Sequence, residues 1–109
     1  MTVGLPQLLF LLLAAHAVAD GPLQSAEMSS LKRSPRAAAR LAALGGHSLI
    51  HGGAVALVTG TWWLGAAETA AHAAIDAAKC RGLFGLWTDQ ALHAGCKCAW
   101  ALIAWRMIG

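Results

Sequence analysis

The sequence contains little charge and few aromatic residues other than tryptophan. Of its 109 residues 12% are charged, two are phenylalanine and none is tyrosine. A soluble domain of this size usually carries about 25% charged residues. Disordered chains are poor in apolar residues, so the 58% hydrophobic content excludes intrinsic disorder. The length excludes a two-domain enzyme.

Cysteine is also scarce, and the common catalytic motifs are absent. Three cysteines are too few, and odd in number, for a disulfide scaffold. The sequence has no phosphate-binding loop, no nucleophile elbow and no HExxH zinc motif. Alanine and leucine dominate instead, and both favour helix over strand. We therefore expect an all-α fold, an integral membrane helical bundle of three or four helices in one domain.

The net charge of +3 comes largely from one short stretch that contains Lys32, Arg33, Arg36 and Arg40. Clustered basic residues beside apolar segments are typical of a cytoplasmic loop and not of a nucleic-acid-binding face. We therefore expect the lipid bilayer as the partner, and no nucleic acid. A second copy or another membrane protein is a further candidate partner. The expected location is the bacterial inner membrane, with the 25–40 loop in the cytoplasm.

Hydropathy divides the chain into predicted helices over about 5–24, 41–64, 66–81 and 86–108, with a polar basic loop over 25–40. The 41–64 segment is uncharged and closes on Trp62 and Trp63, which makes it the clearest predicted span. The first segment ends like a signal peptide, but no basic residue precedes it. We favour a retained helix over cleavage after residue 19. Because 66–81 is short for a span, three and four spans both remain open.

Every histidine and every aspartate falls into a pair at i,i+4 spacing. These pairs are His16 with Asp20, His47 with His51, His72 with Asp76, and Asp89 with His93. Residues at this spacing lie on one face of a helix, one turn apart. Glu68 lies four residues before His72 and extends that stripe. An ionisable side chain at membrane depth costs roughly 2.5 kcal/mol or more, so these groups are expected to face inward.

Imidazole and carboxylate groups converging from several helices suit Zn²⁺, or Mn²⁺ and Fe²⁺ where oxygen ligands are numerous. We predict a divalent metal site with ligands His47, His51, His72 and Asp76, completed by His16, Asp20, Asp89 and His93. In an enzyme the cation would activate a water molecule, with Glu68 or Asp89 as the base. Two other interpretations stay open. The pairs could fix helix register in a non-catalytic accessory or scaffold protein, or form a proton or ion pathway.

The order of the four pairs resembles a multi-pass membrane family of bacteria and their phages, catalogued as domain of unknown function 3307. The resemblance covers about Leu8 to Trp105 and implies a multi-pass membrane protein with no established activity. One departure is Gly21-Pro22 after Asp20, where such proteins usually have a bulky aromatic residue. A more distant similarity, in histidine and aspartate usage only, is to membrane-bound metal-dependent hydrolase-like proteins.

Overall fold

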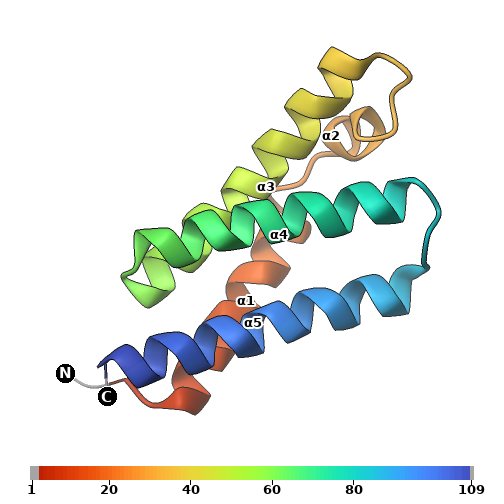
Figure 1. The fold of residues 1–109 in the computed structure, drawn as a ribbon. Coiled ribbons are helices and arrows are strands. Elements are labelled where there is room, and N and C mark those ends of the chain that lie inside the picture. The colour runs from red at the N-terminus through yellow and green to blue at the C-terminus, as the bar shows by residue number, and fades with distance from the viewer. Residues whose placement is uncertain (1–2, 109) are drawn as a thin grey trace.

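The computed structural model describes residues 3–108, and within this range every regular element is a helix. The helices are α1 (Leu5–Asp20), α2 (Ala26–Leu31), α3 (Ala37–Thr59), α4 (Trp62–Cys80) and α5 (Leu86–Ile108). The long helices α1, α3, α4 and α5 alternate in direction along the chain (Figure 1). Because α1 and α4 each pack against both α3 and α5, the long helices close a ring, and α2 lies against α3. The all-α prediction is confirmed.

Local sequence signals account for the helix ends. Pro6 lies in the first turn of α1, where its missing N–H leaves no hydrogen bond unmade. The Ser25 hydroxyl accepts a hydrogen bond from the Met28 backbone N–H (3.0 Å) and caps α2. Gly60 has φ 66°, a left-handed conformation that glycine adopts at little cost. It ends α3 and lets α4 begin at Trp62, so the connection is very short.

Several boundaries differ from those expected from hydropathy. Helix α1 ends at Asp20 and not at 24, because Gly21 and Pro22 interrupt it. The 25–40 segment is not simply a loop, since it contains α2 and the first turn of α3. Trp62 and Trp63 begin α4 instead of closing the preceding helix. Apolar content therefore located the helices but misplaced the turns between them.

Among the described residues, α3 alone is both long enough and apolar enough to cross a membrane, while α1 is apolar but shorter. Helices α4 and α5 contain 19 and 23 residues, yet each carries charged side chains. A multi-span arrangement therefore does not follow from helix composition alone. The direction in which the polar side chains point, inward or outward, is the relevant observation for a membrane location.

The interior of the bundle changes character along its length. An apolar cluster of Leu8, Leu12, Val55, Leu64, Ala101 and Ala104 occupies one half. These residues come from the start of α1, the end of α3, the start of α4 and the end of α5, at the end where both termini lie (Figure 1). The other half is polar. Across the described residues eleven buried side chains are polar or charged and nine are hydrophobic.

Two glycines allow α3 and α4 to approach closely. A Cβ atom at Gly52 would lie 2.6 Å from the Gly65 carbonyl oxygen and would also meet the Thr69 hydroxyl. A Cβ atom at Gly65 would lie 2.5 Å from the Gly52 carbonyl oxygen. This backbone contact sets the spacing of the two helices that carry His47, His51 and His72.

We predict that Gly52→Ala lowers the free energy of unfolding by about 1–3 kcal/mol, because the added methyl group meets backbone that cannot easily move. The neighbouring Gly53→Ala is the matched control. No atom lies within 4 Å of a Cβ built there, and the better helix propensity of alanine should add up to about 1 kcal/mol. Unfolding of the purified protein, followed by tryptophan fluorescence, measures both. Equal stability of the two variants would contradict the close approach.

Candidate metal centre

All five histidine side chains meet inside the polar half of the bundle. They come from four helices: His16 from α1, His47 and His51 from α3, His72 from α4 and His93 from α5. The ring centroids lie 3.7 Å apart for His51 and His72, 4.3 Å for His72 and His93, and 4.6 Å for His47 and His51. Protonated imidazoles at these distances would repel one another, so the packing favours neutral rings. Neutral imidazole is also the form that binds metals.

Asp20, at the end of α1, links three of these rings. Its Oδ1 atom accepts hydrogen bonds from Nε2 of His47 (3.1 Å) and Nε2 of His51 (2.8 Å). Its Oδ2 atom lies 3.1 Å from Nε2 of His16. Within residues 3–108, no lysine or arginine forms an ion pair with Asp20. The negative charge of this carboxylate is therefore met only by imidazole.

Glu68 of α4 orients the fourth ring. Its Oε1 atom accepts hydrogen bonds from the Lys97 ammonium and from the Trp100 indole N–H, each at 2.8 Å. Its Oε2 atom lies 3.2 Å from Nδ1 of His72. An ionised carboxylate can only accept, so Nδ1 of His72 carries the proton and Nε2 keeps a free lone pair. This carboxylate–histidine arrangement is the one that commonly orients a metal-binding imidazole.

Two groups of side chains are arranged so that they could hold a cation. One contains Asp20, His47, His51 and His72, and the other contains Glu68, His72 and His93. In each group the candidate ligand atoms lie within 4.8 Å of one another. The groups share His72. Because the Lys97 ammonium already neutralises Glu68, a cation in the second group would meet a nearby positive charge. The first group, whose carboxylate lacks such a partner, is the better cation site.

A second polar layer separates the histidines from the end of the bundle. There Lys32 contacts Asp76 at 2.8 Å and Lys79 contacts Asp89 at 3.5 Å. A cavity of about 210 Å³ lies between these layers, lined by Asp20, Gln24, Lys32, His47, His72, Asp76, Lys79, Asp89, Gln90 and His93. It therefore reaches three of the four side chains of the first group. It offers room for a water molecule or a small ligand beside the site.

Several buried nitrogen and oxygen atoms of the cluster have no partner within the described residues. Among them are Nδ1 of His47, His51 and His93, and the Ser48 hydroxyl. Buried polar atoms are nearly always hydrogen-bonded in proteins, so such a concentration is unusual. These atoms are available to a water molecule or a ligand.

The eight residues predicted as metal ligands fall into four sets. Asp20, His47, His51 and His72 form the first group, and His93 belongs to the second. His16 lies beside Asp20 but belongs to neither group. Asp76 and Asp89 form ion pairs with lysines in the outer layer. His72 was paired with Asp76 by spacing, but in the structure its ring contacts Glu68. Asp76 is instead bound by Lys32, which follows α2.

Sequence reasoning missed the role of three residues. Lys32 was expected in an exposed loop, yet it is buried beside Asp76. The sequence pattern gives no role to Trp100, whose indole N–H donates to Glu68. Lys97 lies four residues after His93 and so continues the Asp89–His93 stripe. That spacing was the one available signal for Lys97.

We predict that Lys97→Met lowers the free energy of unfolding by roughly 3–5 kcal/mol, because it leaves the buried Glu68 carboxylate without its ammonium partner. The double variant Glu68→Gln with Lys97→Met should recover a large part of this loss, since it removes both charges. Thermal unfolding of the three proteins is the measurement. A double variant no more stable than Lys97→Met alone would mean that Lys97 acts through packing and not through charge.

One protein family matches the sequence of this chain. No curated protein and no solved structure matches the chain. Residues 8–106 match the family described as "protein of unknown function (DUF3307)". This match includes every histidine and every aspartate of the cluster. The chain therefore belongs to the DUF3307 family, whose function is unknown.

Proposed function

We propose that this protein binds one divalent transition-metal cation through Asp20, His47, His51 and His72, inside a helical bundle embedded in a membrane. The observation that carries the proposal is the unequal pairing of the acids inside the bundle, three of them buried and Asp20 part-exposed. Glu68, Asp76 and Asp89 each contact a lysine, whereas Asp20 contacts only imidazoles. A dication among neutral imidazoles would supply the missing positive charge.

The donor set favours zinc. Three imidazole nitrogens and one carboxylate oxygen form the kind of set that Zn²⁺ binds tetrahedrally, with Zn–N distances of about 2.0–2.1 Å. Mn²⁺ and Fe²⁺ are the weaker candidates, because they prefer more oxygen ligands. The cavity beside the site leaves room for one further ligand, and His93 and Asp89 line that cavity. They are the side chains placed to exchange a proton with such a ligand.

The distribution of polar and apolar side chains supports a membrane location. The interior of the polar half holds carboxylates, lysines and histidines, while large apolar side chains face outward. Sixteen large apolar side chains are more than 40% exposed: Phe10, Leu11, Leu13, Val18, Leu23, Leu41, Leu49, Leu57, Trp62, Trp63, Leu83, Leu86, Trp87, Leu92, Leu102 and Met107. Soluble monomers rarely expose so many large apolar side chains. Lipid tails would cover it, and the inward-facing charges explain why α4 and α5 look too polar by composition.

Basic residues support one orientation of the bundle. Lys32, Arg33, Arg40, Ala77 and Arg81 line one pocket, so the α2 region and the end of α4 lie together. The opposite end, with the termini, holds Arg106 of α5 (Figure 1). Positively charged segments stay on the cytoplasmic side of a membrane. The 25–40 segment and the mouth of the cavity would then face the cytoplasm of a bacterial cell.

The same interior argues against the other two interpretations. A proton or ion pathway needs polar groups along the whole bundle, but Leu8, Leu12, Val55 and Leu64 fill its far half. In a purely structural network Asp20 would be expected to pair with a lysine, as the other three acids of the interior do, but within the described residues it contacts only imidazoles. A metal ion that enters from the polar half requires no polar path through the apolar half.

We predict that the purified protein binds close to one equivalent of Zn²⁺ and that His47→Gln and His51→Gln each weaken binding by at least about 100-fold, since loss of even an indirect supporting residue costs 10–100-fold. Calorimetry and elemental analysis measure affinity and stoichiometry. Thermal unfolding in the absence of metal checks that each variant still folds.

The control variant is His93→Gln. It leaves the first group intact and removes a member of the second, so it should change Zn²⁺ affinity far less. A large loss in His93→Gln with little loss in His47→Gln would move the cation to the Glu68 group. Absence of stoichiometric metal in the wild-type protein would refute metal binding altogether.

A separate prediction concerns the membrane. The protein should stay in the membrane fraction after alkaline carbonate washing. In a variant lacking Cys80, Cys96 and Cys98, a cysteine at Ser29 should react with a membrane-impermeant maleimide only from the cytoplasmic side. A cysteine at Met107 should react only from the other side. Extraction by carbonate would contradict membrane embedding, and labelling of both sites from one side would contradict the alternating topology.

A further inference from the structure

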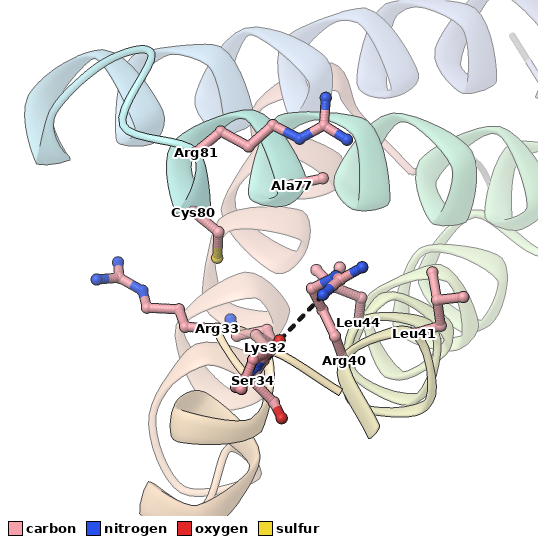
Figure 2. A pocket seen from close by; sticks show the side chains of 10 residues that line it. Lys32, Arg33, Ser34, Arg40, Leu41, Leu44, Ala77, Cys80 and Arg81 are labelled. Carbon is pink, nitrogen blue, oxygen red and sulfur yellow. Dashed lines mark hydrogen bonds between the residues drawn. The ribbon is translucent and has the colours of Figure 1, made fainter. Parts of the chain in front are cut away.

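A second cavity of about 480 Å³ lies beside the metal centre, between the segment after α2, the first turns of α3 and the end of α4 (Figure 2). Its cationic lining residues are Lys32, Arg33, Arg40 and Arg81. Leu41, Leu44 and Ala77 form an apolar wall. The cavity thus combines a cationic rim with a hydrocarbon surface.

The positive charge of this cavity is largely unbalanced. Lys32 is neutralised by Asp76 at 2.8 Å, and Asp89 contacts Lys79 at 3.5 Å. Within residues 3–108, no carboxylate forms an ion pair with Arg33, Arg40 or Arg81, and no acidic side chain other than Asp76 contacts the lysine and arginines of the lining. Three arginines therefore line the space without an acidic partner, and Figure 2 shows the Arg33 and Arg81 side chains extending away from Arg40.

The arginines differ in how firmly they are held. Arg40 is half-buried and donates a hydrogen bond from Nη1 to the Ser34 carbonyl oxygen (3.0 Å), the contact drawn in Figure 2. That bond fixes the guanidinium at the wall and leaves its other N–H groups available. Arg33 and Arg81 are exposed at the rim. One anchored guanidinium group and two exposed ones that are free to reorient are thus available to an anion in the cavity.

The adjoining end of α3 adds to this positive character. Its first turn contains no acidic residue, and its N-cap residue Arg36 provides no side-chain hydrogen bond to the helix. The partial positive charge of a helix N-terminus is usually offset by an acid or a capping oxygen. Here the nearest offset is the Ser34 hydroxyl, which accepts from the Arg36 backbone N–H (3.1 Å).

We propose that this cavity binds the phosphate group of a phosphate-bearing ligand, with the carbon part of the ligand against Leu41, Leu44 and Ala77. A planar guanidinium group can donate two hydrogen bonds to two oxygens of one phosphate. A doubly charged phosphate also neutralises several arginines better than a singly charged carboxylate does. This site goes beyond metal binding and does not rest on it. Lys32 lines both cavities, so a phosphate held here lies next to the mouth of the histidine cluster.

Binding is tested with two probes on the detergent-purified protein and on protein reconstituted into phosphatidylcholine nanodiscs. Calorimetry with inorganic phosphate tests a soluble source of the phosphate group. Nanodiscs with and without phosphatidic acid, compared by thermal unfolding, test a lipid headgroup, because a ligand that binds the folded state raises the unfolding temperature.

The decisive comparison is among single arginine substitutions. Arg40→Gln and Arg81→Gln should each weaken binding about tenfold or more, as expected for loss of a hydrogen bond to a charged group. Arg36→Gln removes the same charge from the same segment, yet Arg36 does not line the cavity, so its binding should stay within about twofold of wild type. Within residues 3–108 the Arg81 side chain donates no hydrogen bond, so this variant keeps the test valid if Arg40→Gln fails to fold.

Saturable binding of inorganic phosphate that depends on Arg40 or Arg81 supports a soluble ligand. A response to phosphatidic acid alone, with the same dependence, supports a lipid headgroup. Equal weakening by Arg36→Gln and Arg81→Gln would show diffuse surface attraction and overturn the proposal, as would the lack of saturable binding of both probes.

Discussion

The pairing of buried charge is the constraint on which the rest of the structure depends. Side chains that carry charge cannot be taken out of water without partners. In this bundle each of Glu68, Asp76 and Asp89 is matched by one lysine from another helix or segment, across distances of 2.8–3.5 Å. These contacts join α4 to α5 and α4 to the end of α2. The polar half of the bundle is therefore assembled by ion pairs, as the other half is assembled by apolar packing.

Asp20 is the exception, because within the described residues it has no lysine or arginine partner. The side chains around it are held in fixed positions by other contacts. Glu68, held by Lys97 and Trp100, sets the tautomer of His72. The close contact of Gly52 with Gly65 brings His72 of α4 next to His51 of α3. Asp20, the last residue of α1, reaches His47 and His51 because α1 packs against α3. A supporting layer of fixed groups around an unsatisfied centre is the arrangement expected of a metal site.

The sequence predicts which side chains share one face of a helix, but it does not predict which helices contact one another. The 3.6-residue repeat places His47 with His51 and Asp89 with His93 on one face whatever the fold, so these alignments were foreseeable. Contacts between helices are not encoded in spacing. Lys32 meets Asp76 only because the chain turns back at α2, and Lys97 meets Glu68 only because α5 packs on α4 in one register. Composition also says nothing of where the charges of α4 and α5 point, because it counts inward-facing and outward-facing charges alike.

The arginine rim has a consequence for the rates at which a cation would come and go. The polar cavity and the basic cavity adjoin at Lys32, while the far half of the bundle is filled by apolar side chains. A dication that uses this side of the molecule passes close to unbalanced guanidinium groups in both directions. The repulsion slows the passage of the cation, and it also disfavours the bound cation to the extent that it reaches the site. Salt screens it, so ionic strength, or an anion seated among the arginines, would hasten exchange and favour the bound cation.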